Sequence, residues 1–198
     1  MSRTPNPDIT TCLKEGWDLY QRDPWLLSGA TLIVGLINFV AGWVPFATLL
    51  TYPVLLGGLY LMIMRLDAGE RPGMSALFDA LPQFLPLVLA SLAISALVFI
   101  GLILLVLPGL YLALAYGFTN LIIVERKLDF WPAMEASRRM VTEHFWNYLL
   151  LMLLFLALCI IGSIPFGLGL LVAVPVCLAA QYRYYRHINA EPSAAEIY

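Results

Sequence analysis

Two histidines and three cysteines are the side chains of this 198-residue chain best suited to bind a metal or act as nucleophiles. His144 and His187 lie about forty residues apart, and neither has metal-ligand spacing around it. Cys12, Cys159 and Cys177 are odd in number and form no motif, and the chain has no glycine-rich phosphate loop. The sequence therefore predicts no catalytic residue, no metal ligand and no cofactor.

Uncharged polar side chains inside apolar segments are the next candidates for a buried site. We select Asn38, Thr119 and Asn120, because a buried amide or hydroxyl is expected to hydrogen-bond to a neighbouring helix or to line a wet cavity. Hydrogen bonding between helices is the favoured interpretation. A polar pathway near Thr119 and Asn120 is the alternative.

A further group of candidates lies in the charged segment ERKLDFWPAMEASRRMVTEHFW, residues 125–146. Glu125 is the acidic residue of this segment closest to an apolar window. We interpret it as a local helix cap or ion-pair partner in preference to a member of a proton relay. The candidates for an interface or a family motif are Glu125, Trp131, Ser137, Arg138 and Arg139.

Composition and charge distribution define the setting of these residues. Hydrophobic residues make up 61% of the chain and charged residues 12%, with a mean hydropathy of +0.84, whereas soluble domains average about 45–50% and about 25%. Three windows, 24–64, 80–124 and 144–182, run for 41, 45 and 39 residues without Asp, Glu, Lys or Arg. Because a membrane-spanning helix needs about 20 apolar residues, each window can hold two.

Each window has a turn signal near its middle, at Pro45, Pro108 and Pro165. Proline lacks a backbone donor and disfavours helix at the residue before it. We therefore predict an all-α integral membrane fold of six transmembrane helices, arranged as three hairpins in a single domain, 1–198. The hairpins are expected at about 25–64, 84–124 and 147–184, with helices near 25–43, 46–64, 84–106, 109–124, 147–163 and 167–184.

A short amphipathic segment precedes each hairpin, at about 9–22, 73–82 and 130–145. In the third segment, Ser137 and the apolar side chains fall on one arc, while Glu135, Arg139, Thr142 and Glu143 fall opposite. Glu135 with Arg139 and Arg139 with Glu143 have the spacing of helical charge pairs. The pattern predicts interfacial helices with their apolar arc against the spans and their charged arc in water.

All eleven basic residues lie before, between or after the hairpins, and none lies in a hairpin turn. The positive-inside rule therefore predicts that both termini are cytoplasmic. The thirteen acidic residues lie on the same face and the net charge is −2, which argues against a nucleic-acid partner.

The first and third hairpins are similar to each other. Pro53 with Tyr60 in the first matches Pro175 with Tyr182 in the third, which indicates an internal repeat. The chain also resembles a group of six-span bacterial membrane families through its segments GWDLYQRDPWLL, PGLYLALAYGFTNLIIVERKLDFWPAMEASRRM and PVCLAAQYRYY. This group contains the YciC-like proteins and the membrane domain of some glycerophosphoryl diester phosphodiesterases. The resemblance implies a multi-pass architecture in the bacterial cytoplasmic (inner) membrane, and it implies no activity, since the phosphodiesterase catalytic domain is absent.

Three functional hypotheses follow. The leading one is a non-enzymatic accessory, scaffold or assembly protein for a membrane complex, with the lipid bilayer and a membrane protein as partners and a homo-oligomer as a further possibility. The alternative is a transporter or lipid-handling protein with a polar pathway near Thr119 and Asn120. An enzyme with an interfacial site is the least favoured.

Overall fold

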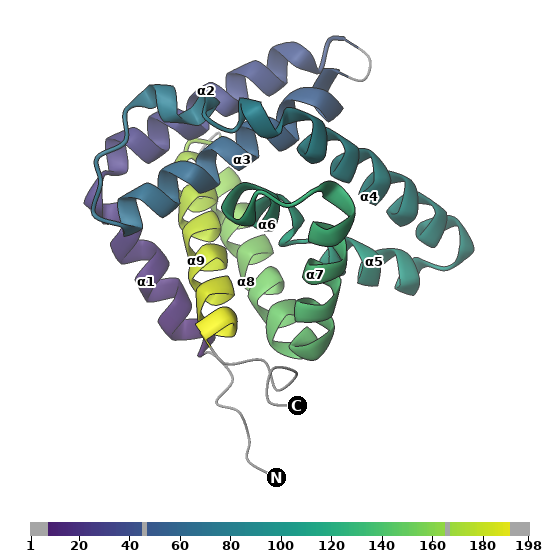
Figure 1. Cartoon of the computed structure of the whole chain (residues 1–198). Coiled ribbons are helices and arrows are strands. Elements are labelled where there is room, and N and C mark those ends of the chain that lie inside the picture. Colours follow the sequence, from purple (N-terminus) through teal and green to yellow (C-terminus); the bar gives the residue numbers. More distant parts are fainter. Residues whose placement is uncertain (1–7, 45–46, 165–166, 191–198) are drawn as a thin grey trace.

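Every regular element of the described chain is helical. The computed structural model describes residues 8–44, 47–164 and 167–190. Figure 1 shows α1 beginning and α9 ending at the same end of the molecule. The elements, α-helices and two 3-10 helices, are α1 (Ile9–Arg22), α2 (Pro24–Ala41), α3 (Ala47–Asp67), η1 (Met74–Phe78), η2 (Leu81–Gln83), α4 (Phe84–Leu104), α5 (Val106–Ala115), α6 (Thr119–Arg126), α7 (Phe130–Glu143), α8 (Phe145–Ser163) and α9 (Leu170–Ala190).

Five segments of the described chain are long and apolar enough to cross a membrane. They are α2, α3, α4 with the 3-10 turns before it, α5 together with α6, and α8. The apolar run of α9 before Gln181 is only 170–180, shorter than the about 20 residues that a span needs. The predicted all-α membrane fold is therefore present with five candidate spans. A sixth span over 167–184, the hairpin arrangement and the orientation of the termini stay predictions.

The structure differs from the sequence prediction in the segment before α4. Residues 73–82 form the two 3-10 helices η1 and η2 in place of one amphipathic helix. Pro82 lies at the start of η2 and cannot donate the hydrogen bond that a continuing helix requires. The segment still buries apolar surface, because Leu77 and Ala80 have no exposed area.

Pro108, the proline predicted to form the turn of the middle window, does not lie at the bend of the chain. The chain bends at Leu105, which has an extended backbone with φ −164° and ψ 140°. Pro108 lies in the first turn of α5. Backbone N–H groups have no intrahelical acceptor there, so a proline at this position costs the helix no hydrogen bond. The other two predicted turns, at Pro45 and Pro165, lie outside the described residues.

Helices α1, α2, α3 and α8 all pack against α9 (Figure 1). The α1–α9 contact is especially close. A Cβ at Gly16 would lie 2.6 Å from the backbone nitrogen of Ala180, so only glycine allows the two helices to approach so closely. Cys12 and Leu19 of α1 are buried in this contact region.

Ion pairs join α1 and α3 to the charged half of α9. The Nε2 atom of His187 lies 3.0 Å from Glu15 Oε2, and Arg183 forms an ion pair with Asp67. The hydroxyl of Tyr182 also donates to Asp67, at 3.1 Å. These contacts place α1, α3 and α9 in fixed positions relative to one another.

We predict that Gly16→Leu separates α1 from α9, because no side chain fits against Ala180. Maleimide labelling of Cys12 should then accelerate by about tenfold or more, corresponding to a packing loss of about 1.4 kcal/mol or more. In the native protein this thiol is protected, since it is fully buried and burial raises the pKa of Cys12 to about 11.

The matched control is Gly35→Leu, at an exposed position of α2 where an added Cβ meets nothing within 4 Å. Both variants are made with Cys159 and Cys177 replaced by alanine, so that labelling reports Cys12 alone. Equal labelling rates in the two variants would contradict the close α1–α9 contact.

Candidate functional site

The helix of the predicted fourth span is broken at residues 116–118, in the interior of the protein. The sequence predicts one helix over 109–124. The segment Val106–Arg126 is a candidate span, but its helix is interrupted, because α5 ends at Ala115 and α6 begins at Thr119. The hydroxyl of Ser137, on α7, accepts a hydrogen bond from Phe118 N at 3.1 Å and donates one to Ala115 O at 2.8 Å. One side chain therefore satisfies two backbone groups at the break.

The amide of Gln181, on α9, is the second partner of the broken segment. Its Nε2 donates to the carbonyl oxygen of Gly117 at 3.0 Å and to the hydroxyl of Tyr148 at 3.0 Å. Its Oε1 accepts a hydrogen bond from the hydroxyl of Tyr60 at 3.1 Å. Gln181, Tyr60 and Tyr148 are all buried. We call these three side chains, with Gly117 and Ser137, the α5–α6 polar network.

Aromatic rings pack together at the Tyr148 side of this network. The ring centroid of Phe118 lies 4.7 Å from that of Tyr148 and 5.7 Å from that of Tyr185, and it stacks on Tyr184 at 6.3 Å. Gly117 must be glycine here, because a Cβ would collide with the hydroxyl of Tyr148. Phe118 and Tyr148 are almost fully buried, and hydrogen bonds are electrostatically stronger in the protein interior than in water.

The polar residues selected from the sequence have different surroundings. Asn38 Nδ2 donates to Val34 O at 2.9 Å, and its Oδ1 accepts from Thr51 of α3 at 3.2 Å, so Asn38 joins α2 to α3. Thr119 and Asn120 lie at the start of α6, beside the break. Thr119 Oγ1 and Asn120 Oδ1 are buried and have no hydrogen-bond partner among the described residues.

Helix α7 has the amphipathic character that its sequence predicts. Ser137 and Val141 are fully buried, whereas Trp131 is 65% exposed. Glu135 pairs with Arg138 and with Arg139, each at 2.8 Å. The hydrogen bonds from these two guanidinium groups hold the pKa of Glu135 at about 2. The predicted ion pair of Arg139 with Glu143 is not formed in the described structure, and Glu135 pairs with Arg138 in addition to Arg139.

Glu125 is half-buried at the end of α6, and the structure gives it no ion pair with a described residue. The basic residue after it makes the defined contacts. Arg126 donates to Tyr185 Oη at 3.1 Å and to Asn189 Oδ1 at 3.0 Å, which joins α6 to α9. Sequence reasoning did not select Arg126.

Sequence reasoning also missed Gln181, Tyr60 and Tyr148, the three side chains at the centre of the network. Gln181 had a usable signal, since it is a single amide directly after an apolar run. Tyr60 had a place in the internal repeat but no signal of hydrogen bonding, and Tyr148 had no signal, because their partners come from other segments of the chain.

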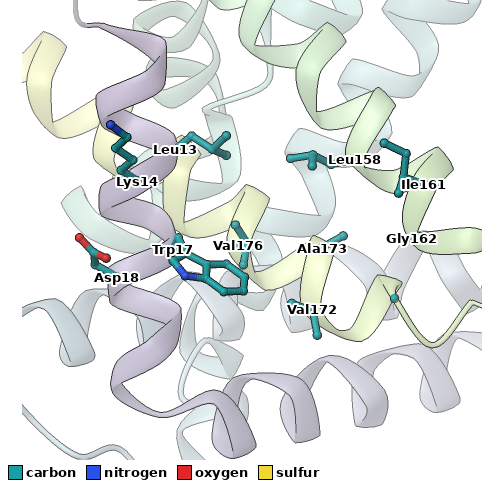
Figure 2. A pocket seen from close by; sticks show the side chains of 11 residues that line it. Leu13, Lys14, Trp17, Asp18, Leu158, Ile161, Gly162, Val172, Ala173 and Val176 are labelled. Atoms are coloured by element: carbon teal, nitrogen blue, oxygen red, sulfur yellow. The ribbon is translucent and has the colours of Figure 1, made fainter.

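An apolar groove between α1, α8 and α9 is the second candidate site, with a volume of about 430 Å³. Figure 2 shows its walls, with Trp17 of α1 on one side and Leu158 and Ile161 of α8 on the other. Val172, Ala173 and Val176 of α9, with Leu13, Gly162 and Gly169, complete the apolar lining. Lys14 and Asp18 are its charged residues, both on α1.

These two sites differ in what they can do chemically. Within the described part of the chain, no cluster of three His, Cys, Asp or Glu side chains could hold a metal ion. The α5–α6 polar network consists of amide, hydroxyl and backbone groups whose hydrogen bonds join different helices, so it holds helices together. The groove has free volume in the range of ligand pockets, about 300–1,000 Å³. The groove is therefore the candidate binding site.

An all-α membrane protein with several candidate spans and a hydrogen-bonded polar core is the class that this fold defines. Residues 85–192 match the family described as "Protein of unknown function (DUF975)", and the chain belongs to this family. A UPF0259 membrane protein of Pectobacterium carotovorum subsp. carotovorum (strain PC1) is 31% identical over 96 residues. That match covers 48% of this chain and 38% of the relative.

No solved structure matches the chain. The comparisons show an uncharacterised family of membrane proteins, and they indicate no enzymatic family. They name neither the YciC-like proteins nor the glycerophosphoryl diester phosphodiesterase membrane domain.

Replacing Gln181 or Asn120 by leucine should have opposite effects on stability. Gln181→Leu removes three hydrogen bonds, each worth about 0.6 kcal/mol in a membrane protein, so it should lower the free energy of unfolding by about 2 kcal/mol. Asn120→Leu removes a carbonyl oxygen without a partner and should raise the same free energy by up to about 1 kcal/mol.

Thermal unfolding of both variants in one detergent measures the difference. Tyr60→Phe is the matched control, because it deletes a single bond to Gln181 and should cost about a third as much as Gln181→Leu. A loss of stability in Asn120→Leu as large as that in Gln181→Leu would mean that Asn120 is hydrogen-bonded.

Proposed function

We propose that this chain is a non-enzymatic membrane protein that binds a lipid in the groove between α1, α8 and α9. The observation that carries the proposal is a concave site of about 430 Å³ whose walls are almost entirely apolar. Such a surface suits a hydrocarbon chain, because apolar walls make van der Waals contacts along an acyl chain and place no polar group against it.

The surroundings of the groove support access from the bilayer. Ile161, which lines it, is 62% exposed. Leu156 and Ile160 on the same helix, and Ile164 directly after it, are also exposed, and they extend the apolar surface of α8. A lipid chain can therefore reach the groove along α8 without crossing a polar barrier.

Binding a lipid is compatible with two of the broader roles expected from the sequence. In an accessory, scaffold or assembly protein the lipid helps to hold a partner complex, and in a lipid-handling protein it is the cargo. We favour lipid handling, because the groove offers room for a ligand. A polar pathway at Thr119 has less support, since Thr119 is only 1% exposed.

Filling the groove should abolish lipid binding. Ala173→Phe places an aromatic ring at the α9 wall, and we expect native mass spectrometry to show at least a fivefold loss of retained lipid, equivalent to about 1 kcal/mol. The matched control is Ala113→Phe, at an exposed position of α5 outside the groove.

Retention of the same lipid by Ala173→Phe and wild type would contradict the proposal. A protein partner retained in stoichiometric amount by both, with no lipid, would support the accessory role instead.

We further propose six spans, with the bend near Pro108 outside the bacterial cytoplasmic membrane and both termini inside. The support is the absence of charged residues from 80–124 and the confinement of basic residues to the other face. In a cysteine-free background, Leu107→Cys should react with a membrane-impermeant maleimide in intact cells, while Ser75→Cys should react only after permeabilisation. The reverse pattern would contradict this orientation.

A further inference from the structure

The groove between α1, α8 and α9 presents no charged group to an occupant. Figure 2 shows the charged ends of Lys14 and Asp18 on the side of α1 that faces away from the groove, while the Trp17 ring lies between α1 and α9. The rest of the lining is aliphatic side chains and glycine. An occupant is therefore recognised through its hydrocarbon part, so the length and width of the groove decide which hydrocarbon fits.

The length of the groove follows from the residues at its two ends along α9. Gly169 lies at one end, where an added Cβ would come 2.6 Å from the backbone of α8. At the other end, Leu13 and Trp17 line the groove on either side of Gly16, which packs against Ala180. Ala180 follows Gly169 by eleven residues, and the helical rise converts this separation into about 16 Å.

The width of the groove follows from its volume. A volume of about 430 Å³ spread over about 16 Å leaves a mean cross-section of about 27 Å². Carbon atoms in contact lie about 4 Å apart, so one extended hydrocarbon chain fills at least about 16 Å² and two chains side by side fill at least about 32 Å². The groove is thus wide enough for one chain and too narrow for two.

We infer that the groove binds a single linear hydrocarbon chain, whatever headgroup that chain carries; this inference rests on the proposed function. Carbon–carbon bonds of about 1.5 Å advance an extended chain by about 1.3 Å per carbon, so about twelve carbons lie within the groove. The occupant is the chain of a single-chain lipid or one of the two chains of a phospholipid. The remainder of the lipid lies outside, along the exposed surface of α8.

This geometry makes the site selective for chain length and indifferent to the headgroup. Each carbon up to about the twelfth adds van der Waals contacts with the walls, whereas any further carbon lies beyond the groove and adds none. The headgroup also lies beyond the walls, where no charged lining residue faces it. Binding is therefore expected to level off with chain length and to be the same for anionic and zwitterionic lipids.

The test uses the full chain in a detergent whose apolar part is a rigid ring system, so that the detergent does not compete for a site shaped for a linear chain. Lysophosphatidylcholines with chains shorter than, equal to and longer than about twelve carbons are offered in equal amounts, and native mass spectrometry counts each bound lipid. We expect retention to rise about threefold over the last four carbons before the twelfth and then to stay constant.

Two further comparisons use lipids with identical chains. Phosphatidylcholine and lysophosphatidylcholine should be retained within about twofold of each other, because only one chain enters the groove. Phosphatidylglycerol should match phosphatidylcholine equally closely. These comparisons need only the wild-type protein, so they do not depend on the folding of a variant.

A variant tests whether the groove itself sets the chain length. Ala173→Leu narrows the groove at its middle and leaves about 10 Å between residue 173 and Ala180, so retention should level off at about eight carbons in place of about twelve. The matched control is Ala113→Leu, at an exposed position of α5 outside the groove, which should leave the chain-length profile unchanged.

The possible failures are distinguishable. Lipid binding that is lost in Ala173→Phe, but that favours two-chain over single-chain lipids by more than about fivefold, overturns the single-chain assignment and leaves the proposed function standing. A headgroup preference of that size, or a chain-length profile that is the same in Ala173→Leu and wild type, overturns the assignment in the same way. A wild-type protein that retains no lipid at all overturns both.

Discussion

A polypeptide that leaves helical geometry inside an apolar core frees backbone N–H and C=O groups, and each of them needs another partner. The three residues between α5 and α6 create this demand, and Ser137 and Gln181 meet it. These two side chains come from α7 and α9, so the break joins both helices to α5 and α6. Gln181 extends the connection to α3 through Tyr60 and to α8 through Tyr148. Van der Waals packing of the buried apolar side chains stabilises the contacts between helices, while these hydrogen bonds select which helices meet.

The placement of α9 also determines the shape of the groove. Three residues of α9 line it, and the same helix carries Gln181. On the other wall, Gly16 sets how closely α1 approaches Ala180. The charged residues of α1 are divided accordingly: Glu15 pairs with α9, and the charged ends of Lys14 and Asp18 face away from the groove. The hydrogen bonds of the core and the proposed lipid site thus share one helix.

The candidate site was only partly predictable from the sequence, and Ser137 illustrates the limit. Its position on the apolar arc of 130–145 indicates that it faces the protein interior, and the structure confirms that it is buried. No periodicity indicates that its hydroxyl bonds to the break at 116–118, because that break belongs to another segment. Gln181 poses the same difficulty, since its partners Tyr60 and Tyr148 are 121 and 33 residues away along the chain.

By itself, the sequence determined the all-α membrane class, the approximate positions of most helices and the buried face of α7. These properties depend on hydrophobic length, charge segregation and helical periodicity, which are local and can be followed along the chain. Only the tertiary structure decided the break between α5 and α6 and the groove beside α1. Each of these depends on groups from distant segments, because a chain that gives up local hydrogen bonds is stabilised only by the partners that the fold brings to it.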